Sequence, residues 1–222
     1  MKVEIWSDII CPFCYIGKRK FELALNQFYP KANIEIEWKS FQLDPEMEKQ
    51  LPGSINQYLS EKKGMPLDQA KQMNLQVTNM AKEVGLDYHF ENAIPNNTLL
   101  AHKLLHFAKH HNKQNVMKER LLQAYFKNGE DIGDTQQLVK IAIELGLDEY
   151  EAFEALNTDV YANEVQMDLY HAQQIGVRGV PFFVFNNKYA ISGAQPVETF
   201  SELLDKVWRE ENEKPGTILQ SV

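Results

Sequence analysis

Short strand-like patterns lie at both ends of the chain, and a long helical stretch separates them. Residues 2–6 and 34–38 alternate apolar and charged side chains, the period of two that is typical of half-buried strands. Between them, an apolar stripe at helical spacing runs from Cys14 to Phe28, and Pro30 ends it. A strand, a helix and a second strand in this order predict a βαβ unit with a right-handed crossover.

The middle of the chain, from Pro52 to about Leu156, is helical in pattern throughout. Four apolar stripes recur there at helical spacing, and three of them end at a glycine. They cover residues 73–84, 101–108, 117–125 and 138–145. Since no fixed-period repeat is present, these helices are predicted to form a bundle rather than a solenoid.

The last third returns to mixed α and β patterns. The unbroken apolar run Phe182–Phe185 predicts a central strand that is buried on both faces. Asn186-Asn187 predicts a hairpin turn, because asparagine tolerates positive φ. A helix over 158–175 is expected before this strand, and a return strand over 188–192 and a helix over 197–208 are expected after it.

This order of elements predicts an α/β protein with a thioredoxin-like fold that is interrupted by a large all-helical insertion. Residues 1–50 and 157–208 are the two halves of the thioredoxin-like domain, and residues 51–156 are the insertion. The charged segment 209–222, poor in core residues, is expected to be a flexible tail.

Charge and hydropathy narrow the classes of partner. The 222 residues include 23 basic and 31 acidic side chains, a net charge of −8 that disfavours nucleic acid as a partner. The apolar run Val180–Phe185 is far shorter than the roughly twenty residues of a spanning helix, so no membrane partner is expected. Acidic residues stand where a signal peptide has its apolar core, which predicts a cytoplasmic protein.

Only two cysteines are present, and they are three positions apart in Cys11-Pro12-Phe13-Cys14. This spacing is open to three interpretations: a redox dithiol, half of a metal site, or coincidence. A structural zinc site needs four ligands and no second cysteine pair exists. Redox chemistry is therefore favoured, with no metal and no tightly bound cofactor.

The position of the motif assigns different roles to the two thiols. Pro12 suits the first position of a helix, which makes Cys11 its N-cap residue. The free N–H groups of Phe13 and Cys14 and the helix dipole are then expected to lower the pKa of Cys11. Cys14 lies on the apolar face and is expected to be buried. Cys11 would attack the substrate disulfide, and Cys14 would resolve the mixed disulfide. Because Phe13 brings no charge to the site, the protein is predicted to be a mild oxidant.

Two further positions, Asp8 and Val180-Pro181, bear on the chemistry of this motif. Asp8 would oppose thiolate formation if its carboxylate came close, although a turn or cap residue is the favoured interpretation. Val180-Pro181 precedes the buried strand, where a proline removes a hydrogen-bond donor. A cis bond there would leave the backbone of Val180 free to bind substrate, and an ordinary trans bond is the alternative.

Three histidines, His102, His106 and His110, are four residues apart on one predicted helix. Their spacing is open to two interpretations, a Cys2His2 metal site with the two thiols or a solvated surface. The surface is favoured for His106 and His110, because their positions move away from the apolar stripe along the helix. His102 borders the apolar face and is expected to lie near the active site, without an assigned catalytic role.

Several separated motifs together resemble the DsbA-like branch of the thioredoxin superfamily, and within it the FrnE-like group of dithiol–disulfide isomerases. They are the Cys11–Cys14 motif, Gly179–Val184, Asn97–His102, Gly129–Asp134 and Ile191–Pro196. The resemblance implies that Cys11 is the nucleophile, that Cys14 is its partner and that Pro181 is a cis-proline beside them. It implies protein or small-molecule disulfides and thiols as partners, with glutathione or another small thiol as candidate co-substrate.

The same branch offers an alternative on the same scaffold. Kappa-class glutathione transferases and 2-hydroxychromene-2-carboxylate isomerases share the architecture but typically carry serine in place of one cysteine of the motif. Because this chain keeps both Cys11 and Cys14, disulfide exchange is favoured over glutathione-dependent transfer or isomerisation. A binding protein whose dithiol performs no turnover is the third hypothesis. The oligomeric state is left open, with a dimer among the candidates.

Overall fold

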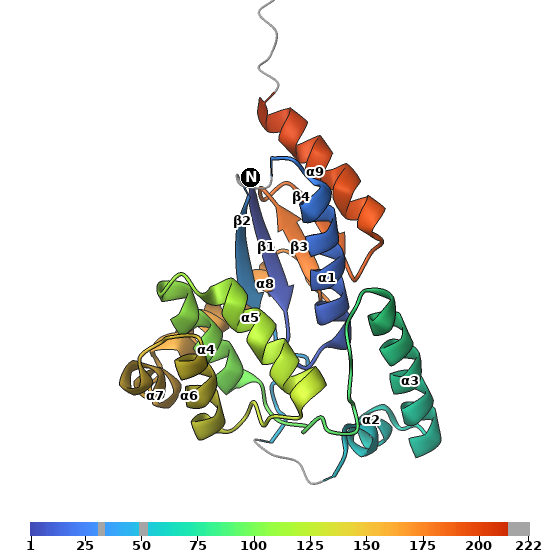
Figure 1. Ribbon diagram of the computed structural model, residues 1–222, viewed down its shortest axis with the longest axis vertical. Coiled ribbons are helices and arrows are strands. Elements are labelled where there is room, and N and C mark those ends of the chain that lie inside the picture. Colours follow the sequence, from blue (N-terminus) through green and yellow to red (C-terminus); the bar gives the residue numbers. More distant parts are fainter. Residues whose placement is uncertain (31–33, 49–52, 213–222) are drawn as a thin grey trace, which may run out of the picture.

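A four-stranded mixed sheet forms the centre of the molecule in the computed structural model, which describes residues 1–30, 34–48 and 53–212 (Figure 1). The strands are β1 (Lys2–Ser7), β2 (Glu35–Ser40), β3 (Phe182–Phe185) and β4 (Tyr189–Ser192). Their order is β2-β1-β3-β4, with β1 parallel to β2 and antiparallel to β3, and β3 antiparallel to β4. The predicted βαβ start and the predicted hairpin at the end of the chain are therefore joined in one sheet.

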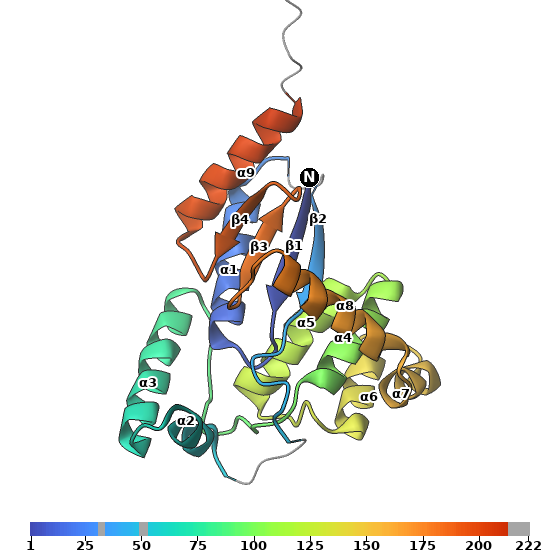
Figure 2. The ribbon, with the colours of Figure 1, turned by 180° about the vertical axis from the view of Figure 1, so that it is seen from behind.

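Helices cover both faces of this sheet. Helices α1 (Pro12–Gln27) and α9 (Val197–Asn212) lie side by side on one face, and α8 (Val160–Gln174) lies on the other, against β2 (Figures 1 and 2). On the first face Phe21 of α1 meets Phe183 of β3 and Phe200 of α9, with ring centroids 5.5 and 5.6 Å apart. These fully buried rings pack α9 and the middle of α1 against the sheet.

The inserted helices form two groups on either side of α1 (Figure 1). One is a hairpin of α2 (Ile55–Lys63) and α3 (Leu67–Glu83). The other contains α4 (Leu99–His110), α5 (Gln114–Gln123), the π-helical turn η2 (Ala124–Asn128), α6 (Thr135–Glu144) and α7 (Glu149–Asn157). The predicted stripes correspond to α3, α4, α5 with η2, and α6, whereas α2 and α7 were not predicted. The fold is the expected thioredoxin-like one with a helical insertion.

Two expectations about the end of the chain are corrected. In β3, Phe183 and Phe185 are buried but Phe182 and Val184 are only half-buried, because α8 packs on β2 and leaves the second face of β3 partly open. Helix α9 continues to Asn212, so the first four residues of the expected flexible tail are helical.

Contacts with the sheet explain that longer helix. Glu211 accepts a hydrogen bond from Asn186 and pairs with the N-terminal ammonium of Met1, and Glu210 pairs with Lys188. The rest of the expected tail, 213–222, and the expected domain boundary at residue 51 lie outside the described residues, so the division into domains stays a prediction. Among the helices described, none is long and apolar enough to cross a bilayer.

Candidate active site

The Cys11–Cys14 motif occupies the junction between β1 and α1. Cys11 is the N-cap residue of α1, with extended backbone angles of φ −85° and ψ 112°, and Pro12 is at the first helical turn. The N–H of Cys14 donates to the carbonyl of Cys11 at 3.0 Å. Since β1 ends at Ser7, this geometry places both sulfurs at one end of the central sheet.

The two thiols differ in their access to solvent. Both cysteines are reduced, and Cys14 is fully buried, as expected. Cys11 is 4% exposed, and it lines a cavity of about 420 Å³ that Cys14 does not line. Phe13 stands at the same cavity and is 39% exposed. Any substrate that enters the cavity therefore meets Cys11 and not Cys14.

The loop before β3 brings the other expected site residues to the same place. The Val180–Pro181 peptide bond is cis, as the resemblance implied. The thiol of Cys11 donates to the carbonyl of Val180, with 3.6 Å between sulfur and oxygen. Gly17 of α1 packs so closely under this loop that a Cβ atom there would lie 2.8 Å from Cγ of Pro181.

The charge distribution in the dithiol differs from the sequence-based expectation. A hydrogen bond with Cys14, burial and the nearby Asp8 raise the pKa of Cys11, and the backbone amide of Cys14, which lowers it, does not outweigh them. The pKa of Cys14 is lowered despite burial, because Cys11, the Lys118 ammonium and the Ser7 hydroxyl stabilise its thiolate. The helix end alone therefore does not make Cys11 acidic, and a thiolate is favoured on Cys14 over Cys11.

Lys118 of α5 is the cation behind this pair, and sequence reasoning missed it. Its side chain is fully buried, with Nζ 3.5 Å from the carbonyl oxygen of Ser7 and 5.4 Å from the centroid of the Trp38 ring. Burial lowers the pKa of Lys118 to about 8, although Cys14 and Asp8 oppose the change. The apolar spacing of Leu121, Leu122 and Tyr125 after Lys118 was the signal that this lysine faces the core.

Asp8 is a buried member of the site rather than only a turn residue. One carboxylate oxygen accepts from the amide of Ile9 at 2.7 Å and lies 3.1 Å from Nε2 of His102, and the other accepts from the amide of Leu43 at 2.7 Å. Burial raises the pKa of Asp8, but His102 and the Leu43 amide outweigh it and lower the pKa. Burial lowers the pKa of His102, so the pair consists of a carboxylate and a neutral imidazole. His102 therefore lies near the dithiol, as expected.

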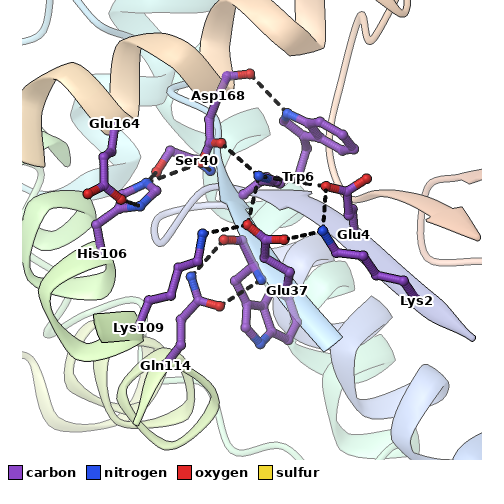
Figure 3. Close-up of polar contacts among 12 residues, drawn as sticks. Lys2, Glu4, Trp6, Glu37, Ser40, His106, Lys109, Gln114, Glu164 and Asp168 are labelled. Atoms are coloured by element: carbon purple, nitrogen blue, oxygen red, sulfur yellow. Dashed lines mark hydrogen bonds and ion pairs between the residues drawn. The ribbon is translucent and has the colours of Figure 1, made fainter. Parts of the chain in front are cut away.

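His106, expected on the surface, is buried between β2 and α8 (Figure 3). Its Nε2 lies 3.0 Å from the Ser40 hydroxyl and 3.1 Å from the Asp168 carboxylate, and its Nδ1 lies 3.0 Å from the Glu164 carboxylate. These contacts tie α4, β2 and α8 together, which is why a polar residue is found there. Ser40 is fully buried, so this Ser–His–acid group is closed to a substrate.

The third histidine, His110, is exposed as expected and lies 2.8 Å from Glu164. The three histidines thus contact carboxylates and do not converge with the thiols. Within residues 1–30, 34–48 and 53–212, no group of three His, Cys, Asp or Glu side chains is placed to hold a metal ion.

A reduced dithiol at a helix start, opposite a cis-proline loop, is the arrangement of the thioredoxin class of redox proteins. The family model of the DsbA-like thioredoxin domain matches residues 2–205. The chain therefore belongs to the DsbA-like thioredoxin domain family.

Three relatives show how far the similarity extends. The uncharacterized protein YwbO of Bacillus subtilis is 32% identical over 206 residues, which are 91% of this chain and 94% of YwbO. A probable DsbA oxidoreductase of Streptomyces coelicolor is 35% identical with a TM-score of 0.89, over 99% of this chain and 94% of that one. The cytosolic disulfide reductase DsbM of Pseudomonas aeruginosa has a TM-score of 0.69 at 14% identity, over 95% of this chain and all of DsbM, which shows a shared fold alone.

Proposed function

We propose that this protein is a thiol–disulfide oxidoreductase in which Cys11 attacks a substrate disulfide and Cys14 resolves the mixed disulfide. The observation that carries the proposal is the unequal access of the two thiols: Cys11 opens to the cavity beside cis-Pro181, and Cys14 lies behind it. Family membership supports a redox or isomerase activity of this kind.

The reaction needs no group beyond the two cysteines and the substrate. The thiolate sulfur of Cys11 attacks one sulfur of the substrate disulfide, the substrate S–S bond breaks, and one substrate thiolate leaves. The thiolate of Cys14 then attacks Cys11, which forms the Cys11–Cys14 disulfide and releases the second substrate thiolate. The two substrate sulfurs gain the two electrons that the dithiol loses, and the same steps in reverse oxidise a dithiol.

The lowered pKa of Cys14 suits the second step. When the hydrogen-bonded pair has lost one proton, transfer of the remaining shared proton from Cys11 to Cys14 frees the Cys11 thiolate for attack. Once Cys11 is bonded to substrate, it no longer donates to Cys14. Cys14 must then give up the proton it has taken, and the substrate thiolate that left in the first step can accept it. Lys118 and Ser7 favour the ionised form of Cys14 as the attacking thiolate, so the buried cation acts mainly on resolution.

Disulfide reduction by single-cysteine variants tests this assignment. Wild type and the Cys11→Ser and Cys14→Ser variants would be assayed for insulin reduction, refolding of scrambled protein and reduction of bis(2-hydroxyethyl) disulfide. We expect Cys11→Ser to abolish all three activities, and Cys14→Ser to stop at a stable mixed disulfide. Activity that survives Cys11→Ser would contradict the proposal.

Finer parts of the proposal follow from the sequence. We place the protein in the FrnE-like group and in the cytoplasm, where thiols are kept reduced and a Cys-x-x-Cys pair is more often catalytic than structural. Protein or small-molecule disulfides are the substrates, with glutathione or another small thiol as co-substrate. Thiol conjugation of an electrophile without disulfide exchange would favour the transferase or isomerase alternative instead.

A further inference from the structure

The cavity at Cys11 is walled by the α2–α3 hairpin. Ile55 and Leu59 of α2 and Met73 and Val77 of α3 line one side, and Phe90 adds an aromatic ring. The thiol is consequently reached through an apolar cavity of about 420 Å³ and not from a flat surface. A volume of that size is within the range of small-molecule sites.

Most polar groups in this cavity already have protein partners. The Tyr58 hydroxyl and the Lys62 ammonium both bond to the carboxylate of Asp44, at 2.6 and 2.7 Å. The side-chain amide of Asn74 donates to Asn56 at 2.7 Å. The bonds to Asp44 hold α2 to the segment after β2, and the Asn74–Asn56 bond joins α3 to α2. None of these groups can orient a ligand without breaking a bond.

Tyr125 is the buried exception. Tyr125 lines the cavity and is 1% exposed. Its hydroxyl has no hydrogen-bond partner among the described residues. A buried hydroxyl without a partner costs about 1–3 kcal/mol, so such a group in a cavity is expected to have a use. Burial and the nearby Asp8 raise the pKa of Tyr125, which keeps the hydroxyl a neutral donor.

The backbone around Tyr125 is also unusual. The residue lies in η2, the π-helical turn that continues α5 and ends at Gly129, whose φ is +66°. Single π-turns within helices are rare and often occur at functional positions. This turn contributes Tyr125 to the cavity that also holds Cys11.

On these grounds we propose that the substrate is a low-molecular-weight disulfide with an apolar body, and that the Tyr125 hydroxyl selects it by donating a hydrogen bond to a carbonyl or carboxylate oxygen. This inference rests on the proposed function, since the disulfide is attacked by Cys11. Lys63, which also lines the cavity and forms no ion pair within the described chain, favours an anionic substrate. Tyr125 would be a specificity residue that binds the substrate without taking part in sulfur chemistry.

The test is the concentration dependence of disulfide reduction by the reduced enzyme in single turnover. The probe is 5,5′-dithiobis(2-nitrobenzoate), an aromatic disulfide with a carboxylate on each ring, and bis(2-hydroxyethyl) disulfide and glutathione disulfide are compared with it. We expect the rate to saturate only with the aromatic carboxylate. Tyr125→Phe should raise the half-saturating concentration about tenfold and leave the maximal rate within about twofold.

Matched variants separate binding from folding. Tyr161→Phe removes a hydroxyl from a half-buried tyrosine of α8 outside the cavity and should change neither constant. The melting temperature of Tyr125→Phe should equal or exceed that of wild type, because removing this hydroxyl breaks no hydrogen bond within the described protein. Val77→Trp, which fills the cavity, should remove saturation, whereas Met80→Trp on the exposed side of α3 should not.

The outcomes separate this inference from the proposed function. Rates that rise linearly with every disulfide, a preference for glutathione disulfide, or an unchanged half-saturating concentration in Tyr125→Phe would overturn the inference while exchange by Cys11 stands. Release of thionitrobenzoate by Cys11→Ser at the wild-type rate would instead overturn the proposed function.

Discussion

The sulfur of Cys11 lies 3.6 Å from the carbonyl oxygen of Val180, a residue 169 positions later in the chain. This contact joins the two ends of the sequence across the helical insertion, at the point where β1 and β3 lie side by side. The Cys11 thiol has one proton and lies within reach of two acceptors, this carbonyl and the sulfur of Cys14. In the proposed mechanism Cys11 loses that proton when it bonds to a substrate sulfur, which would leave the backbone of Val180 available to the substrate.

Replacing Lys118 by methionine should make the dithiol less acidic. The ammonium favours the thiolate of Cys14, so its removal raises the pKa of that thiol and leaves less thiolate at neutral pH. Ultraviolet thiolate absorbance followed over pH measures the change. Lys109→Met, which removes a cation that contacts Glu37, is the matched control and should titrate like wild type. An unchanged titration of Lys118→Met would show that the buried cation has no influence on the thiols.

Gly17→Ala should destabilise the protein despite the better helix propensity of alanine. In an open helical position this change is worth about 1 kcal/mol in favour of alanine. Here the new Cβ would stand 2.8 Å from Pro181 and 3.5 Å from Ala194, so overpacking of about 1–3 kcal/mol dominates. Urea unfolding measures the sign of the change in the free energy of unfolding. The rate of disulfide reduction should also fall, because the Pro181 loop is displaced. A more stable Gly17→Ala variant would mean that the loop gives way easily.

The buried Asp8–His102 pair should make stability fall in mild acid. Both groups have a lowered pKa in the folded protein, so the unfolded chain binds more protons as pH falls from about 6.5, the ordinary value for histidine. The free energy of unfolding therefore rises with pH through this window, by at most about 1.4 kcal/mol per pH unit for one proton. His102→Asn should lower stability at pH 7.5 and flatten the slope between pH 5.5 and 7.5.

The control for that slope is on the same helix. His110→Asn removes an exposed imidazole that contacts Glu164 and leaves the Asp8–His102 pair intact. If His102→Asn and wild type lose stability in parallel between pH 7.5 and 5.5, the buried imidazole is not the group that takes up the proton.

The local periodicities of the sequence were enough to predict the sheet and most helices. Alternation over 2–6 and 34–38 corresponds to β1 and β2, and the positive φ of Asn186 and Asn187 agrees with the expected turn. Helix α2 was not predicted because it carries one buried side chain, Ile55, and therefore shows no apolar stripe. It begins at a capping box on Ser54. The last turn of α9 was not predicted because its acidic residues are stabilised by partners that are distant in sequence. These partners lie at the start of the chain and in the β3–β4 turn.

The candidate site likewise contains residues that the sequence could predict and residues that it could not. Cys11 and Cys14 could be found because their local order carries the chemistry, and the cis bond at Pro181 was implied by the family resemblance. The buried groups behind them, Asp8, His102 and Lys118, come from three separate segments and meet only in the folded chain. Apolar spacing around Lys118 indicates that this lysine faces the core, but it does not show which groups the lysine meets there, so the pKa order of the two thiols could not be predicted from the helix end alone.

The measurement that tests the account most directly is site-resolved alkylation of the reduced protein, read by mass spectrometry of the peptide that contains Cys11 and Cys14. Short exposure to iodoacetamide at neutral pH should modify Cys11 alone in wild type, because only Cys11 lines the cavity, and Cys11→Ser should resist modification. Faster modification of Cys14 than of Cys11 would contradict the assignment of Cys11 as the attacking thiol.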